Sequence, residues 1–307
     1  MPGATATSLR STASAPGVAA FVDPSSCPRP RLRALASVLG GRPVAVIGTG
    51  ADAERAASAG LTVLRSFQPP LGRVSLSGSA LRRAGFGGRR FGTVIAAGAR
   101  AAEAVRALGM RPEPMPDALP EPLAPLAAAG LRKEWGVRDG ECACLLLASP
   151  ASACDARAAL DVAGRAAILG RPIVLVVHPD AGNAGQAAQL ASAAGGAWRI
   201  AFDERAEEPE LLASGVAAAL AFDRRLPIES VGTPARGVAG AFAAFVRGAR
   251  PPIEPGDPIA IRLAVRAGLP VISCGTAGDS FVPDACRFDP RRPSAAARAL
   301  SAQIRRG

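Results

Sequence analysis

The chain lacks tyrosine altogether and contains one lysine, Lys133, and one histidine, His178. A structural zinc site needs thiolate and imidazole ligands at close spacing. Because there is a single histidine and the six cysteines are mostly far apart, no metal centre is expected. Cys142 and Cys144 lie two residues apart in an expected strand, which predicts small buried side chains on one face of that strand.

Long apolar runs are also missing. A membrane-spanning helix needs about 20 consecutive apolar residues, and the longest apolar run, 211–222, is interrupted by Ser214 and Gly215. The amino terminus lacks the basic start, apolar centre and cleavage site of a signal peptide, so the sequence favours a cytoplasmic protein. The 34 glycines and 28 prolines follow no period, which excludes a fibrous chain.

The residues in excess are alanine and arginine. Alanine supplies 69 of 307 residues, so only about 27 points of the 49% hydrophobic fraction belong to larger apolar side chains and cysteine. The net charge is +11, of which +8 lies in residues 1–125 and +3 in 126–307. This excess favours an anionic partner for the first part of the chain, such as phosphate or an anionic membrane surface. Nucleic acid is not expected, because no reader motif or aromatic stacking run accompanies the charge.

The alternation of strand-like and helix-like segments predicts an α/β fold with two Rossmann-like lobes, parallel sheets and a cleft between the lobes. Residues 1–30 have no periodicity and are expected to form a disordered leader. Residues 31–125 would form a short first lobe that ends in the proline-rich segment 112–125, which can be neither a helix nor a central strand. Residues 126–307 would form the second lobe.

The individual elements follow from short apolar runs and helical periodicity. Strands are expected at 43–48, 61–65, 92–97, 143–148, 172–177, 198–202, 216–221 and 269–273, and helices at 31–39, 51–59, 100–108, 126–135, 155–169, 185–194, 208–214, 237–247, 257–267 and from 293.

Ligands of parallel α/β sheets bind beyond the carboxyl ends of the strands. The loop that begins Gly48-Thr-Gly50 follows an expected strand, and its glycines would let a pyrophosphate approach the next helix. The following strand ends in Arg65-Ser66, where an NADP-binding protein can place arginine. The loop therefore indicates an NAD(P)-dependent oxidoreductase, and a glycine turn without a ligand is its structural alternative.

Two further loops occupy the same position after a strand. His178 follows the strand 172–177, where it could accept a proton or bond to a neighbouring backbone group. Ser149 follows the strand 143–148 and offers a hydroxyl and backbone N–H groups. For both residues, ligand contact and a local structural role stay open.

The segment 252–273 is the most informative one. A glycine and proline loop feeds a helix in which Pro258 occupies a first-turn position, Gly268 ends that helix, and a strand follows. A helix amino terminus that faces the glycine-rich end of a strand is a natural diphosphate pocket. The candidate ligand contacts in this segment are Glu254, Gly256, Asp257, Pro258, Arg262 and Ser273.

This segment resembles the signature of the group-1 (family-4) glycosyltransferases of GT-B fold, whose motif runs Glu-Gly-x-Pro, four variable residues, Glu-Ala-x-Ala-x-Gly-x-Pro-Val. The matching positions are Gly256, Pro258, Ala264, Gly268, Pro270 and Val271. Phe288-Asp-Pro290 is similar to a later turn of the family, and fainter likeness extends the resemblance over 43–305. The resemblance implies a hexosyltransferase with a nucleotide-sugar as substrate, no cofactor, a retaining reaction, and 126–307 as the donor-binding lobe.

The motif is degenerate. The positions of the two family glutamates, which hold the donor sugar and the ribose, carry Pro255 and Leu263. The basic residues that neutralise the donor diphosphate in the family would fall near 149–155, where none is present. Arg262 and Arg236 are the expected substitutes.

Three functions stay open at this point. The first is a glycosyltransferase that binds the donor on the second lobe and a glycan, lipid or small-molecule acceptor on the basic first lobe. The second is a catalytically inactive relative that acts as a binding protein, which the lost glutamates and the short first lobe favour. The third is the NAD(P)-dependent oxidoreductase suggested by the Gly48 loop.

Overall fold

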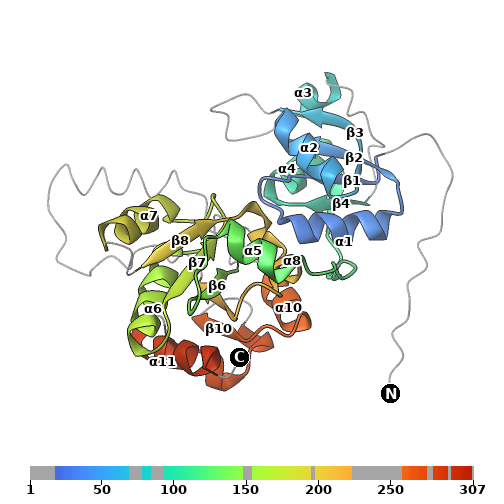
Figure 1. Cartoon of the computed structure of the whole chain (residues 1–307). Helices are drawn as coiled ribbons and strands as arrows, with labels where there is room; N and C mark the ends of the chain where they lie inside the picture. The colour runs from blue at the N-terminus through green and yellow to red at the C-terminus, as the bar shows by residue number, and fades with distance from the viewer. Residues whose placement is uncertain are drawn as a thin grey trace, which may run out of the picture. The chain divides into compact units, whose positions relative to one another are not determined.

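A computed structural model of the chain describes residues 18–68, 78–83, 93–147, 154–194, 198–222, 258–274, 279–289 and 292–305. The described residues form two compact α/β units, each with its own parallel sheet (Figure 1). Unit 1 contains the described residues up to Cys27 and Leu35–Asp117, and unit 2 contains Pro28–Ala34 and the described residues from Ala118 onward. The boundary after Asp117 lies inside the proline-rich segment 112–125.

Unit 1 is built on five parallel strands in the order β3-β2-β1-β4-β5. The strands are β1 Ala20–Val22, β2 Pro43–Ile47, β3 Thr62–Phe67, β4 Thr93–Ala97 and β5 Arg111–Pro114. The helices that contribute to it are α1 Arg29–Leu39, α2 Gly50–Ser58, α3 Gly78–Arg83 and α4 Ala99–Ala107. Phe21 of the central strand lies beside Ala45 and Ala96 and packs in one core cluster with Leu81 and Val105.

Strand β1 lies inside the segment that the sequence predicted to be a leader, and for residues 18–30 that prediction was wrong. Ala20 and Val22 are fully buried at the centre of the sheet. A run of three residues is too short to produce a periodic signal, and this one is surrounded by residues typical of loops. Residues 1–17 lie outside the described part of the chain.

The proline-rich segment contributes strand β5, which contains Pro112 and Pro114. This strand pairs only with β4, at the edge of the sheet. Proline cannot donate a hydrogen bond to a neighbouring strand, so it is tolerated at an edge. The prediction that the segment forms neither a helix nor a central strand is confirmed here.

Unit 2 has five parallel strands in the order β10-β9-β6-β7-β8. Its strands are β6 Cys142–Leu146, β7 Ile173–Val177, β8 Arg199–Phe202, β9 Ala218–Phe222 and β10 Val271–Cys274. Its main helices are α5 Ala128–Glu134, α6 Ala156–Leu169, α7 Ala184–Ala193, α8 Pro209–Leu212, α10 Ile259–Arg266 and α11 Pro293–Ile304. The two sheets share one plan: the first strand lies in the centre, two strands follow on one side, and the chain then crosses to the other side. This architecture confirms the predicted α/β fold with two Rossmann-like units.

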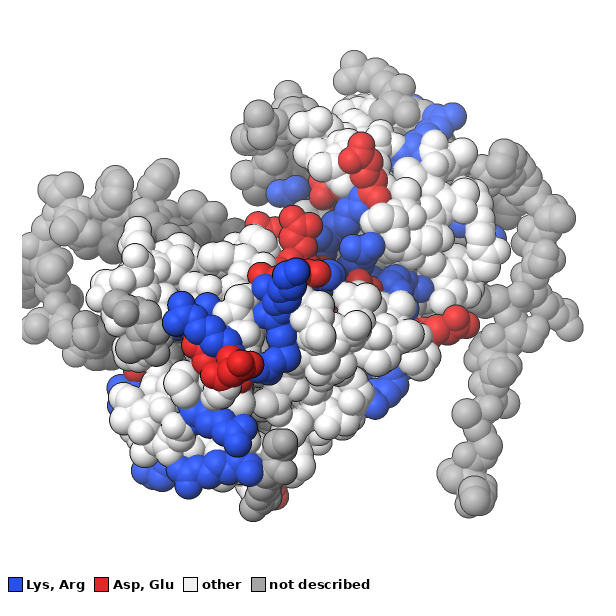
Figure 2. Space-filling view, viewed as in Figure 1, with Lys and Arg blue, Asp and Glu red and all other residues white. Residues whose placement is uncertain are grey.

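Acidic and basic side chains interleave on the face of unit 2 that carries α5 (Figure 2). Glu134 of α5 pairs with Arg205, which follows β8. Glu141, just before β6, pairs with Arg199 of β8 at 2.5 Å between Oε2 and Nη1. The carboxylates of this face are therefore largely neutralised by neighbouring arginines.

The first part of α1 belongs to unit 2, where buried carboxylates hold it. The backbone N–H of Arg29 donates to Oε2 of Glu207 at 3.2 Å. Nη1 of Arg33 donates to Oε1 of Glu208 at 3.1 Å. Glu207 and Glu208 follow β8 and are buried, so this contact joins segments that are far apart in the sequence.

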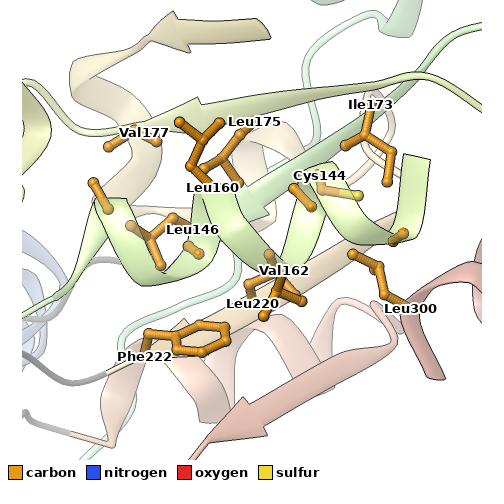
Figure 3. Close-up of a cluster of buried hydrophobic side chains, with 14 of the residues drawn as sticks. Cys144, Leu146, Leu160, Val162, Ile173, Leu175, Val177, Leu220, Phe222 and Leu300 are labelled. Atoms are coloured by element: carbon orange, nitrogen blue, oxygen red, sulfur yellow. The ribbon is translucent and has the colours of Figure 1, made fainter. Parts of the chain in front are cut away.

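The core of unit 2 lies on both faces of its sheet, and β6 shows why. All five of its residues are buried, as expected for the central strand of a parallel sheet covered on both sides. Cys142, Cys144 and Leu146 face the cluster that contains helices α6 and α11 (Figure 3), whereas Ala143 and Leu145 face the opposite cluster. Both cysteines are therefore small buried side chains on one face, as predicted, and burial raises the pKa of the Cys144 thiol.

Candidate functional site

The carboxyl ends of β6 and β9 mark the topological switch point of unit 2. The chain leaves β6 toward β7 on one side of the sheet and later reaches β9 on the other side. Loops diverge at such a point and leave a crevice, which is where open α/β sheets bind ligands. The described residues that follow β6 and β7 at this edge include Cys154, Asp155, His178, Asp180 and Asn183.

Asp155 connects three loops at this edge. Its Oδ1 caps α6 by accepting hydrogen bonds from the N–H groups of Arg157 and Ala158 at 3.1 and 3.0 Å. The same oxygen accepts from Nδ2 of Asn183 at 3.1 Å, and the N–H of Asp155 donates to the carbonyl of Phe222 at 2.9 Å. The start of α6, the loop after β7 and the end of β9 are thereby held together.

Asn183 adopts a left-handed backbone conformation, with φ of 61°. Asparagine tolerates this region better than most residues with a Cβ, yet it still stores some strain. Strain of this kind is found at sites where the loop shape matters. Neither Asp155 nor Asn183 was predicted as a site residue, because their only signal in the sequence is their position in the loops that follow two buried strands.

His178 lies directly after β7, and its side chain is buried. Its Nδ1 accepts a hydrogen bond from the N–H of Asp180 at 3.1 Å. An accepting Nδ1 carries no hydrogen, so the neutral ring has its hydrogen on Nε2. This is the neighbouring backbone contact that the sequence left as one of two alternatives, and a ligand contact through Nε2 stays a prediction.

Helix α10, Ile259–Arg266, lies within the predicted range 257–267, and Pro258 is the residue before its first turn rather than part of that turn. It begins directly after Pro258, and Gly268, with φ of 76°, follows its last turn. The half-buried Arg262 places its guanidinium carbon 5.4 Å from the ring centre of Phe281, which follows β10. A cation over an aromatic face at this separation is attracted by the ring, so the Arg262 head group lies against the short helical turn Asp279–Phe281.

Ser273 lies within β10, beside Ala221 of β9, and none of its surface is exposed. Its carbonyl accepts a hydrogen bond from the N–H of Phe288 at 2.8 Å. In this conformation the hydroxyl lies in the protein interior. Its role as a donor contact stays a prediction.

Ser149, Arg236, Glu254, Gly256 and Asp257 lie outside the described residues, as does the expected helix 237–247. Pro258, Arg262, Ser273 and His178 are therefore the predicted site residues of unit 2 whose positions are known.

In unit 1 the Gly48–Gly50 loop follows β2, one strand away from the central strand β1. Thr49 caps α2, and its N–H and hydroxyl donate to Oδ2 of Asp52 at 2.7 and 2.9 Å. A Cβ on Gly48 would lie 2.4 Å from that oxygen. The glycine thus makes room for a carboxylate at the helix amino terminus, where a dinucleotide-binding protein places a phosphate.

The switch point of unit 1 lies instead at the ends of β1 and β4. Asp23, which is 1% exposed, follows β1 and accepts hydrogen bonds from the hydroxyls of Ser25 and Ser26 at 2.6 and 2.9 Å. Gly98, with φ of 97°, follows β4 and approaches so closely that a Cβ would lie 2.4 Å from Oγ of Ser26. Asp23, Ser25 and Ser26 were not predicted as site residues because 1–30 was assigned to the leader.

Metal and membrane sites are not evident in the described ranges. No cluster of three or more histidine, cysteine, aspartate or glutamate residues in these ranges could hold a metal ion. None of the described helices combines the length and the apolar character needed to cross a bilayer. Comparison with family models and with curated proteins finds no match to the chain.

Proposed function

We propose that the protein is a glycosyltransferase of the GT-B type that binds a nucleotide-sugar donor on unit 2. The observation that carries the proposal is the structural position of the residues that match the family signature. Pro258 precedes α10, Ala264 lies on its buried face, and Gly268 follows it with a positive φ. Pro270 and Val271 then lead into β10. Proline is favoured where a helix starts, a small residue where a helix packs closely, and glycine where a helix stops. Each matching residue of this chain lies at a position of that kind, and the last two lie where the strand starts.

The donor diphosphate would lie at the amino terminus of α10, where the backbone N–H groups of the first turn and the helix dipole favour negative charge. Arg262, one turn further along, is the residue that would stabilise the charge that develops on the leaving diphosphate. Among the residues that the structure describes, no carboxylate or histidine is identified as a general base for the acceptor. This favours a retaining reaction in which the leaving phosphate assists, as the family resemblance implies.

Binding of UDP, GDP and ADP, measured by titration calorimetry, tests the donor site. We expect one of them to bind, and Arg262→Ala to weaken that binding by about tenfold, as for the loss of a hydrogen bond to a charged group. Arg298→Ala is the matched control, because Arg298 is an exposed arginine on α11. Absence of binding for all three nucleotides at millimolar concentration would contradict the proposal.

A catalytically inactive binding protein is the second candidate. It is favoured by the burial of Ser273 and by the absence of both motif glutamates at positions 255 and 263. A protein of this kind would bind a nucleotide or glycan but release no free nucleotide from UDP-, GDP- or ADP-sugars. Release of nucleotide in the presence of an acceptor extract, lost in Arg262→Ala and kept in Arg298→Ala, would exclude it.

A further inference from the structure

A cavity of about 590 Å³ lies in unit 2 at the edge of the sheet opposite the candidate donor site. Cys142, the first residue of β6, lines it together with Ala217, which precedes β9, and Pro270, which precedes β10. The cavity is therefore formed at the amino ends of three adjacent strands. Its volume lies within the range of about 300–1,000 Å³ that is typical of small-molecule sites.

The charged groups that line the cavity are Arg132 of α5, Arg171 before β7, and Glu141 before β6. The Glu141 carboxylate is already engaged, because it accepts hydrogen bonds from the N–H of Arg138 at 2.7 Å and from Nη1 of Arg199 at 2.5 Å. Burial by itself would raise the pKa of Glu141, but these two hydrogen bonds outweigh it and hold the pKa below its usual value. Glu141 is thus a neutralised anion, and the lining arginines keep their charge uncompensated.

The two lining arginines are held differently. Arg132 is half-buried, and its Nη2 donates to the backbone carbonyl of Glu141 at 3.1 Å, which fixes the guanidinium and leaves other N–H donors for a ligand. Arg171 is exposed, and within the described part of the chain it has no hydrogen bond or ion pair. One guanidinium is therefore pre-positioned and the other is able to close over a bound anion.

The rest of the lining determines which anion would fit. Val216 and Ile304 supply aliphatic surface, and Gln303 at the end of α11 supplies an amide. None of the described residues that line the cavity is aromatic, so this lining offers no stacking surface for a nucleobase. A compact ligand with a polar or aliphatic body suits this lining better than a nucleotide.

We propose that this cavity binds a small phosphate monoester of about the size of a sugar phosphate. A phosphate dianion matches two guanidinium groups in charge, and the planar fork of arginine forms paired hydrogen bonds with phosphate oxygens. The site is separate from the donor site on α10 and does not depend on the proposed transferase activity.

Titration calorimetry of the full chain with glucose 6-phosphate, glycerol 3-phosphate and inorganic phosphate tests this proposal, with glucose and citrate as the uncharged and carboxylate probes. We expect the phosphate esters to bind and glucose not to bind. Arg171→Ala should raise the dissociation constant about tenfold, as for the loss of charge-assisted hydrogen bonds, and Arg171→Lys should restore only part of the affinity.

Arg298→Ala and Arg262→Ala are the controls, and both should bind the phosphate ester as the unchanged protein does. A thermal melt of each variant, followed by circular dichroism, shows that it is folded. Three outcomes would overturn the proposal: no binding of any phosphate ester at millimolar concentration, equal binding by Arg171→Ala, or binding of citrate in preference to the phosphates. Loss of phosphate binding in Arg262→Ala alone would place the ligand at the donor site instead.

Discussion

The indole Nε1 of Trp135 donates a hydrogen bond to Oδ2 of Asp203 at 2.9 Å, with both residues buried. Arg205 binds the other oxygen, Oδ1, through its backbone N–H at 2.9 Å and its Nε at 2.8 Å. Burial by itself would raise the pKa of Asp203, but the hydrogen bonds from Arg205 and Trp135 outweigh it and hold the pKa below its usual value. The residue that follows α5 is therefore tied to the segment after β8 by an ionised carboxylate.

The stability of unit 2 should depend on pH through Asp203. A carboxyl group whose pKa is lower in the folded state stabilises the protein above its unfolded pKa of about 3.9, and this contribution is lost as the pH falls through the folded pKa. We therefore expect the free energy of unfolding to decrease as the pH falls below about 4. Asp203→Asn should be less stable at neutral pH and should show a shallower decrease. Urea unfolding followed by circular dichroism at a series of pH values measures both slopes, and equal slopes would contradict the prediction.

The capping arrangement around Gly48 gives a matched pair of glycine substitutions. In Gly48→Ala the new Cβ would meet Oδ2, Cβ and Cγ of Asp52 at 2.4–2.8 Å. The capping box would be disrupted, at a cost of about 1–2 kcal/mol in the free energy of unfolding. Gly50→Ala meets nothing within 4 Å and should change stability by less than about 0.5 kcal/mol. Chemical denaturation of the two variants measures the difference, and equal stabilities would show that the box contributes nothing.

A second pair of glycines lies within helices of unit 2. A Cβ on Gly164 of α6 would lie 2.5 Å from Nε1 of Trp198, whereas a Cβ on Gly130 of α5 would meet nothing within 4 Å. Gly164→Ala should therefore destabilise the chain by about 1–3 kcal/mol through overpacking. Gly130→Ala should stabilise it by about 0.5–1 kcal/mol, because alanine is the better helix former. Thermal melts compare the variants, and a stable Gly164→Ala would mean that Trp198 moves aside freely.

The buried ion pair of Glu210 should contribute more to the free energy of unfolding than an exposed ion pair does. Oε1 of Glu210 accepts from Nε of Arg266 at 2.7 Å, and the Glu210 side chain is 5% exposed. Glu210→Ala should cost about 2 kcal/mol, since it removes a hydrogen bond between charged groups and leaves Arg266 without a carboxylate partner, with only the bond from its Nη1 to the carbonyl of Pro120. Asp161→Ala removes a 3.0 Å pair with Arg165 on the surface of α6 and should cost less than about 0.5 kcal/mol. Urea unfolding of both variants measures the two losses in the free energy of unfolding. A larger loss for Asp161→Ala than for Glu210→Ala would contradict the prediction.

Much of the fold could be predicted because its strands are apolar runs separated by long helical segments. β7 and α6, for example, are recognisable from Ile173–Val177 and from the helical pattern that ends at Gly170. Strand β1 could not be found, since three residues carry no period and their burial depends on pairing with β2 and β4. The local sequence pattern therefore does not predict a strand whose formation depends on pairing with neighbouring strands.

The candidate site was harder to predict than the fold. The helix start at Pro258 and the stop at Gly268 were evident, because proline and glycine have local effects on the backbone. The contacts of Asp155 with Asn183 and Phe222 join loops that come together only through the order of the strands. Such contacts depend on the order of the strands in the sheet, and the spacing of residues in the sequence does not predict them.

Unit 2 is discontinuous in the chain, because residues 28–34 belong to it and unit 1 lies between them and Ala118. During synthesis these residues emerge first, whereas Glu207, which binds the N–H of Arg29, emerges 178 residues later. The first turn of α1 therefore has to wait for its carboxylate partners until unit 1 and most of unit 2 have been made. A fragment that begins at Ala118 would lack the N–H of Arg29, which binds Glu207, and the guanidinium of Arg33, which binds Glu208. We therefore expect such a fragment to be less stable than unit 2 in the full chain.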